Sequence, residues 1–303
     1  MARNPKNPAA SVHQRLLNQA KASARPFHEL LQYFAIERFL YRLSQSAHAD
    51  RFILKGALMF SAWGASETRP TKDIDLLGKM DNRLEAIVAA IQDACAQKVV
   101  ADGMVFNPAT VTAARIAEEN EYQGVRVRVQ GNLGPARVSL QVDIGFGDII
   151  FPRPRKISYP TLLDFPPPQL RGYSRESVIA EKFQAMVKLG VLNSRMKDFY
   201  DLWLLSLKFD FQGRTLAAAV EKTFARRKTA LSSQPTVFQD AFVHDEGKQT
   251  QWRAFVKKSK LEDAPKTLAE VVAPVQAFLG PLAAALAEKK TFSKVWIAPG
   301  PWR

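Results

Sequence analysis

The segment that most constrains the fold is residues 52–78, FILKGALMFSAWGASETRPTKDIDLLG. An apolar run meets Gly56, a helical apolar pattern follows as far as Gly64, and the segment ends with Asp73 and Asp75 alternating with apolar residues. Because successive side chains of a strand point to opposite faces, the two aspartates share one face and the apolar residues occupy the other. The segment predicts a strand, a helix and a second strand that carries two neighbouring carboxylates.

Carboxylates this close repel each other, which raises one pKa unless a positive charge keeps both ionised. Mg²⁺ fits this need, because it takes one or two carboxylates and completes its shell with water and phosphates. The open alternative is a surface strand with two solvated aspartates. A third carboxylate, Asp143, lies between Val142 and Ile144, a costly position unless it is paired or bound to metal. We therefore expect Asp73, Asp75 and Asp143 to hold Mg²⁺, with Mn²⁺ as the second choice.

Apolar spacing elsewhere predicts mostly helices, at residues 27–43, 83–96, 174–190, 195–208, 215–227 and 267–289. Strict alternation predicts a strand at residues 125–130, with Arg126 and Arg128 on a shared face that either steers phosphates or faces solvent. The tail carries Trp296 and Trp302 among prolines and glycines. We expect it to be irregular and its tryptophans to pack on the body or on a partner.

A glycine that opens a helix, an Asp-hydrophobic-Asp strand and a later hydrophobic-Asp-hydrophobic strand resemble the layout of the nucleotidyltransferase fold. Four ordered blocks make the chain similar to the AbiEii/AbiGii toxin family: residues 54–60 (LKGALMF), 69–76 (R-x-T-x-DIDL), 173–185 (Y-x-x-E-x-VIAEKFQA) and 194–202 (SR-x-KDFYDL). The match spans roughly residues 50–205, about half the chain. One departure is Ala57, where many members have glycine or serine, so backbone N–H groups would have to contact a phosphate there.

The resemblance implies an α+β protein, with a nucleotidyltransferase-like mixed β-sheet domain followed by a C-terminal helical domain. Its members are toxins of bacterial toxin–antitoxin and abortive-infection systems, which serve antiviral defence. The implied reaction is Mg²⁺-dependent transfer of NMP from an NTP to an RNA acceptor, a tRNA 3′ end first among candidates. A cognate antitoxin restrains the resulting growth arrest.

The resemblance also implies which residues form the site. The catalytic residues would be Asp73, Asp75, Asp143, Lys182 and Asp201, with Asp143 helping to activate the acceptor hydroxyl. The nucleotide would be bound by Lys55, Gly56, Arg69, Thr71, Lys182, Arg195 and Asp198. The ammonium of Lys182 would act as a point charge on the phosphates, although a lysine beside an apolar helix stripe also reaches water along its stem. Asp198 and Asp201 share one helix face, so they either bind Lys182, cap the site or neutralise nearby basic residues.

Prolines divide the chain. Residues 151–168 contain six prolines around a basic group, which excludes a helix or a central strand there. We interpret the stretch as the connection between two domains. The expected organisation is N-terminal helices at residues 1–50 that pack on the core, a nucleotidyltransferase domain at 51–165 and a helical domain at 166–303.

The formal net charge of +14, with a pI near 9.9, favours a polyanionic partner, nucleic acid before membrane. The alternative is a protein that is basic only for solubility. The single cysteine, Cys95, excludes an internal disulfide and a cysteine metal cluster. No run of eighteen apolar residues occurs, so we expect a soluble, cytoplasmic protein without a membrane partner. We further expect it to be a monomer.

Two further functions stay open at this stage. An enzyme of the same fold could modify a hydroxyl of a protein or a small molecule, although the charge argues against the small molecule. A non-catalytic nucleic-acid-binding module is the other alternative, and Ala57 is the residue that favours it.

Overall fold

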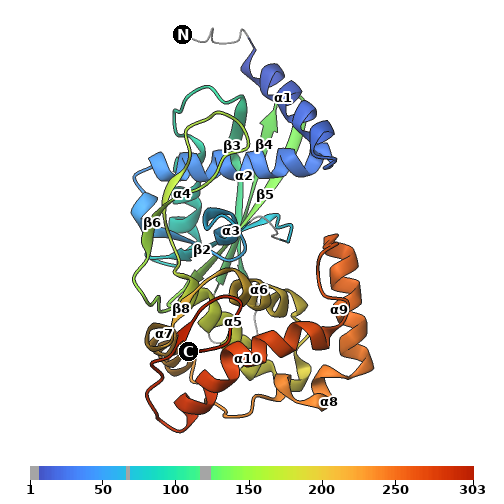
Figure 1. Cartoon of the computed structure of the whole chain (residues 1–303). Coiled ribbons are helices and arrows are strands. Elements are labelled where there is room, and N and C mark those ends of the chain that lie inside the picture. Colours follow the sequence, from blue (N-terminus) through green and yellow to red (C-terminus); the bar gives the residue numbers. More distant parts are fainter. Residues whose placement is uncertain (1–6, 66–68, 117–123) are drawn as a thin grey trace. The chain divides into compact units, whose positions relative to one another are not determined.

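The computed structural model describes residues 7–65, 69–116 and 124–303 of the chain. These residues form two compact units. Unit 1 comprises Met1–Gly147 and Arg155–Gly172, and unit 2 comprises Asp148–Pro154 and Tyr173–Arg303. Both helices and strands are present, which confirms the α+β class (Figure 1).

Unit 1 is built on a mixed sheet, which in the described part of the chain has seven strands in the order β3-β4-β5-β2-β1-β7-β6. β2 runs parallel to β5 and β1 runs parallel to β7, whereas the other neighbours are antiparallel. The strands are β1 (Phe52–Lys55), β2 (Asp73–Gly78), β3 (Met104–Ile116), β4 (Gly124–Leu133), β5 (Ala136–Phe146), β6 (Arg155–Ser158) and β7 (Gln169–Gly172). The strands predicted around Asp73, Val125 and Asp143 are confirmed as β2, β4 and β5.

Helices cover the apolar face of this sheet. Alternate residues of β4 and β5, such as Val127 and Val142, are fully buried, and α2 and α4 pack on the same layer (Figure 1). The helices are α1 (Pro8–Ala22), α2 (Phe27–Gln45), the short α3 (Leu58–Ala62) after β1, and α4 (Leu84–Cys95), with a 3-10 turn η1 (Ala49–Arg51) before β1. The predictions of helices at residues 27–43 and 83–96 are confirmed. α1, whose bounds were not predicted, lies within residues 1–50, where N-terminal helices were expected.

The proline-rich stretch at residues 151–168 differs from the simple connection that we expected. Its residues 155–158 form the edge strand β6, which pairs with β7, so unit 1 continues to Gly172. Two buried side chains of α2 also hold the stretch: the backbone N–H of Leu162 donates to Glu37 Oε2 at 2.7 Å, and Arg38 Nη2 donates to the carbonyl of Pro166 at 2.8 Å. An edge strand needs only one hydrogen-bonded neighbour, which is why prolines can flank it.

Unit 2 is helical. Ser174 caps its first helix by accepting a hydrogen bond from the N–H of Ser177, and the helix ends at Gly190, which confirms the helix predicted at residues 174–190. Its elements are α5 (Arg175–Leu189), α6 (Met196–Lys208), α7 (Gly213–Arg226), α8 (Asp240–Val243), α9 (Glu246–Ser259), α10 (Leu268–Ala287), the 3-10 turns η2 (Gly190–Leu192) and η3 (Thr236–Phe238), and a small ribbon of β8 (Phe211–Gln212) with β9 (Val295–Trp296).

The C-terminal tryptophans close this unit. The indole N–H of Trp296 donates to the carbonyl of Ser206, and that of Trp302 donates to the carbonyl of Phe278. Both rings are buried, which confirms that they pack on the body. The expectation of an irregular tail is wrong at residues 295–296, because these pair with Phe211–Gln212 as β8 and β9.

Helix α10 is long and apolar enough to cross a membrane, and among the described residues it is the one helix that meets this test. Its apolar side chains nevertheless have partners in unit 2, because Val275, Phe278 and Leu282 are fully buried where the helix packs on α6. The composition of α10 is therefore explained by its place in the core of this unit.

Candidate active site

The carboxylate of Asp75 lies directly against the backbone of Gly56. β1 pairs with β2 so that Lys55 is opposite Asp75, and the chain then turns at Gly56 with a φ of +71°. A Cβ built on Gly56 would stand 2.0 Å from Asp75 Oδ2. Glycine is therefore required twice, by the left-handed backbone and by the carboxylate that occupies the space of a side chain.

Asp73 and Asp75 point to one face of the sheet, as the alternation predicts. Asp73 is exposed and Asp75 is half-buried, whereas Ile74 between them is completely buried on the other face. The parallel pairing of β2 with β5 sets Asp75 beside Asp143. Three carboxylates from two neighbouring strands thus share one face.

Asp143 is held by an arginine of the next strand. Arg126 Nε and Nη2 donate to Asp143 Oδ1 and Oδ2 at 2.9 and 2.8 Å, a two-point pair between cross-strand neighbours. A carboxylate between Val142 and Ile144 was expected to need either an ion-pair partner or a metal. The structure shows the ion-pair partner. The sequence carries a signal for this pair, because counting outward from the two-residue turn at Gly134 and Pro135 places Arg126 opposite Asp143.

The donor set fits a divalent cation only in part. Among the described residues, no group of three histidine, cysteine, aspartate or glutamate side chains lies close enough to hold a metal ion. Asp73 and Asp75 offer hard oxygen ligands on one face, and two carboxylates are the usual protein share of a Mg²⁺ shell. Asp143 could add a third carboxylate only while it shares its lone pairs with Arg126, because each of its oxygens already accepts a hydrogen bond from that side chain.

The loop before β2 is fixed by α2, through residues that sequence reasoning missed. The backbone N–H of Thr71 donates to the Tyr33 hydroxyl at 3.2 Å, and Gln32 Nε2 donates to the carbonyl of Lys72 at 3.3 Å. Because Tyr33 and Gln32 touch the loop only through tertiary packing, no local pattern announces them. Of the other expected nucleotide ligands, Arg69 lies half-buried in this loop.

Ala57, which follows Gly56, is buried and starts the turn into α3. Its methyl group supplies no hydrogen-bond donor or acceptor. The backbone therefore carries any polar contact at this position, as expected from the sequence.

The expected residues of unit 2 form a second, closed cluster. Lys182 Nζ lies 2.7 Å from Asp198 Oδ1 and 2.8 Å from Asp201 Oδ2, and Arg195 Nε lies 2.6 Å from Asp198 Oδ2. Both carboxylates are buried, with 0% of Asp198 and 2% of Asp201 exposed. Of the alternatives left open for Asp198 and Asp201, the structure shows ion pairing with Lys182, and Arg195 joins the same cluster.

Electrostatics in this cluster favour the charged forms. Burial by itself raises the pKa of Asp198, but the nearby Lys182 and Arg195 outweigh burial and hold the pKa well below its usual range. The Lys182 side chain is 12% exposed, so its ammonium is directed at carboxylates rather than along an apolar surface to water.

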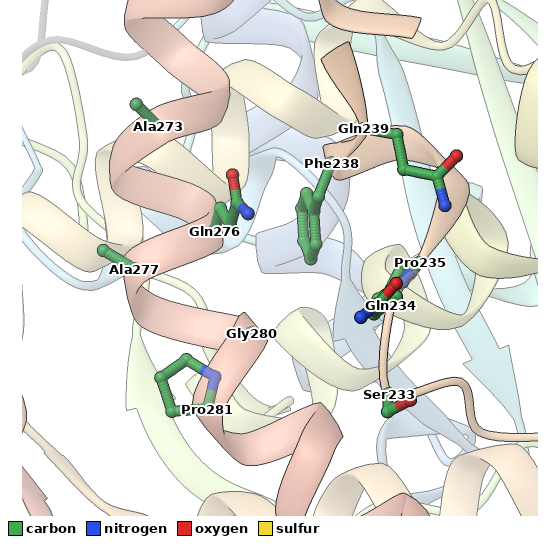
Figure 2. A pocket seen from close by; sticks show the side chains of 10 residues that line it. All are labelled: Ser233, Gln234, Pro235, Phe238, Gln239, Ala273, Gln276, Ala277, Gly280 and Pro281. Carbon is green, nitrogen blue, oxygen red and sulfur yellow. The ribbon is translucent and has the colours of Figure 1, made fainter. Parts of the chain in front are cut away.

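Unit 2 contains a groove of about 610 Å³ between α10 and the segment around η3 (Figure 2). Its lining contains no charged side chain and consists of Ser233, Gln234, Pro235, Phe238, Gln239, Ala273, Gln276, Ala277, Gly280 and Pro281. A triphosphate needs cationic or metal partners, so this groove does not fit a nucleotide.

A family model and solved structures show which proteins this chain is similar to. The family model described as nucleotidyl transferase AbiEii toxin, type IV TA system, matches residues 38–278. No curated protein matches the chain. Among solved structures, the nucleotidyltransferase toxin MenT4 from Mycobacterium tuberculosis H37Rv has a TM-score of 0.51 at 17% identity, over 92% of this chain and 98% of that chain. JHP933 from Helicobacter pylori has a TM-score of 0.48 at 15% identity, over 86% and 93%.

Proposed function

Because the chain belongs to the AbiEii nucleotidyltransferase toxin family of type IV toxin–antitoxin systems, we propose that it transfers NMP from an NTP to an RNA acceptor. Membership establishes a nucleotidyltransferase that uses an NTP and a system with a cognate antitoxin. The RNA acceptor, the metal ion and the individual site residues are our proposal. The observation that carries it is the packing of the Asp75 carboxylate against Gly56, since this contact joins two parts of the expected motif in one place.

In this proposal Asp73 and Asp75 hold a divalent cation, with Mg²⁺ first and Mn²⁺ second. A cation bound there would offset negative charge on the α-phosphate and on the pyrophosphate leaving group. The residues around it orient the nucleotide: the Gly56 backbone allows close approach, and Lys55, Arg69 and Thr71 supply donors to phosphate oxygens. Tyr33 and Gln32 of α2 position Thr71 and Asp73 by binding the loop that leads into β2.

Asp143 is proposed to take the proton of the attacking hydroxyl. In the structure both of its oxygens accept hydrogen bonds from Arg126, so Asp143 accepts a proton either at a lone pair that this pairing leaves open or in place of one of the two bonds. Arg126 is therefore the partner on which the role of Asp143 depends.

Four residues of unit 2 complete the proposal. Lys182 and Arg195 are cationic contacts for phosphates, and Asp198 and Asp201 hold them in place. The buried pairing also supports a structural role, and a variant described in the Discussion separates the two roles.

An RNA acceptor is favoured by the net charge of +14. Lysine and arginine contacts to phosphates release counterions, so the affinity for RNA should fall log-linearly as salt rises. An affinity that does not change with salt would favour a protein or small-molecule hydroxyl as acceptor. We further propose that the protein acts in the cytoplasm as a monomer, with tRNA as the first acceptor to test.

The decisive experiment measures label transfer from an α-labelled NTP to total tRNA by the wild type and by Asp73→Asn and Asp75→Asn. Each variant should lose transfer by several orders of magnitude and keep the melting temperature of the wild type, because these side chains are not core groups. Full activity in either variant would remove the metal proposal. Transfer by the wild type to no RNA at all would remove the acceptor proposal.

A further inference from the structure

The face of β4 and β5 opposite their buried valines is polar and exposed over most of its length. Its cross-strand neighbours are basic, amide and hydroxyl side chains: Asn132 opposite Arg137, Gln130 opposite Ser139, and Arg128 opposite Gln141. β3 extends two of these rows, with Asn107 beside Gln130 and Thr112 beside Arg128. The next row along the strands is the Arg126–Asp143 pair.

This polar face leads away from the candidate active site. Asp143, its last row, is the neighbour of Asp75, and Arg137 lies six residues back along β5. At a rise of about 3.3 Å per residue, the face extends about 20 Å from the site carboxylates. Within the described strands β3, β4 and β5, Asp143 is the one acidic residue, and Arg126 neutralises it.

We infer that this face is the docking surface for a base-paired stem of the RNA acceptor. The inference rests on the proposed function, because it names where the acceptor of that reaction binds. Arg128 and Arg137 are exposed cations that would contact phosphates, and the amides and Ser139 would reach phosphates and 2′-hydroxyl groups. A polyanion is the partner that matches a surface with cations and almost no carboxylates.

A base-paired stem fits this face better than a single strand does. Proteins that bind single-stranded RNA stack its bases on exposed aromatic rings. No exposed position of β3, β4 or β5 in the described residues is aromatic, and Phe106 of β3 is buried. Polar side chains that read phosphates and 2′-hydroxyl groups are instead typical of recognition of RNA helices by shape.

The experiment measures binding of a synthetic RNA hairpin with a single-stranded 3′ end, at several salt concentrations, to the full chain. The test variant is Arg128→Gln with Arg137→Gln. The matched control is Arg83→Gln with Lys98→Gln, which removes the same charge from exposed positions at and after α4. The test variant should bind about tenfold or more weakly, and the slope of log K against log salt should become shallower by about 0.9 per lost phosphate contact. The control should bind like the wild type.

Three results would overturn the inference. They are unchanged binding by the test variant, an equal loss in the control, and tighter binding of an unstructured oligouridine of the same length than of the hairpin. Binding needs no catalysis, so it is scored separately from label transfer. If the wild type labels RNA and the test variant binds normally, the docking surface is wrong and the proposed function stands. If the wild type labels no RNA, the proposed function fails.

Discussion

The molecule has two pairs of neighbouring carboxylates, Asp73 and Asp75 on β2 and Asp198 and Asp201 on α6. The two pairs differ in their exposure and in their surroundings. On β2 the carboxylates lie on a polar sheet face, with Asp73 exposed. On α6 both are buried, and the charges that balance them come from Lys182 and from Arg195 of the same unit.

The difference separates two uses of the same residue type. A carboxylate can be buried in its charged form only when the fold supplies partners, and those partners then tie elements together, here α5 to α6. A carboxylate that stays at the surface contributes little to stability and remains accessible to a cation or a substrate. Loss of the α6 cluster should therefore affect folding first, whereas loss of the β2 pair should affect chemistry.

The largest expected loss of stability is that of Lys182→Met. The variant leaves Asp201 and one oxygen of Asp198 without their ammonium partner in a buried place, which typically costs about 3–5 kcal/mol. Arg195→Met is the matched control, because its side chain is 45% exposed and water replaces part of the lost contact. It should cost about 1 kcal/mol. Denaturant unfolding measures both, and equal losses would contradict the closed-cluster interpretation.

The same variant tests the proposed role of Lys182 toward the nucleotide. At a temperature where Lys182→Met is folded, loss of a charged hydrogen bond should lower kcat/KM by about one to two orders of magnitude. Transfer that is unchanged in the folded variant would restrict Lys182 to a structural role.

A second prediction concerns Glu37, a buried carboxylate whose negative charge receives few hydrogen bonds. Only 1% of it is exposed, Oε2 accepts from Leu162, and no hydrogen bond reaches Oε1 within the described residues. Burial raises the pKa of Glu37 to about 8. The folded state therefore binds a proton that the unfolded state has released between about pH 4.5 and pH 8, so stability falls as pH rises through this range.

Glu37→Gln should remove this pH dependence, because an amide keeps the hydrogen bond and carries no charge. Relative to the wild type it should gain on the order of 4–5 kcal/mol above pH 8, since each pKa unit corresponds to about 1.4 kcal/mol. Glu85→Gln, at an exposed position of α4, is the control and should leave the profile unchanged. Thermal melts between pH 5 and pH 9 measure the effect, and parallel profiles for Glu37→Gln and the wild type would contradict it.

The β1 to β2 segment was predictable because its signals are local. Alternation, a glycine and a helical spacing all lie within this one segment. The cap at Ser174 and the stop at Gly190 are also local signals, at the two ends of α5. β3 was missed because Pro108 and an irregularity in pairing between Asn107 and Thr112 break its alternation. α9 was missed because Trp252 is its one buried residue, so it has no apolar stripe.

The contacts that define the sites were harder to predict than the elements. Periodicity places Asp198 and Asp201 on one face, but it does not state which helix that face meets. The pairing of Arg126 with Asp143 depends on strand register, which a recognised turn at residues 134–135 would have fixed. The contacts of Gln32 and Tyr33 depend on how α2 crosses the sheet, for which a single sequence has no local signal.

The next prediction compares two glycines with the same backbone. Gly56 and Gly64 both have positive φ, at +71° and +76°, but a Cβ on Gly64 would meet nothing within 4 Å. Gly64→Ala should therefore cost only the strain of a left-handed alanine, about 1 kcal/mol. Gly56→Ala should cost about 2 kcal/mol and abolish transfer, because the methyl group displaces the Asp75 carboxylate. Melting curves and label transfer on both variants measure this, and an active Gly56→Ala would contradict the site.

The smallest expected effect on stability is that of Arg126→Gln. The same variant, assayed together with Asp143→Asn, tests whether Asp143 is a catalytic carboxylate like Asp73 and Asp75 or a structural one like those of α6. The pair is partly exposed, with 37% of the Arg126 side chain and 20% of the Asp143 side chain accessible, so its loss should cost about 0.5–1 kcal/mol.

If Asp143 serves only as the partner of Arg126, then Asp143→Asn and Arg126→Gln should lower stability equally, and both should retain transfer. If Asp143 accepts the proton of the attacking hydroxyl, Asp143→Asn should lose transfer by about 10²–10⁴-fold, whereas Arg126→Gln frees the carboxylate and should keep it. Label transfer on the two single variants and the double variant measures this. A double variant as active as Arg126→Gln would place Asp143 with the structural carboxylates of α6, and one as inactive as Asp143→Asn would place it with Asp73 and Asp75.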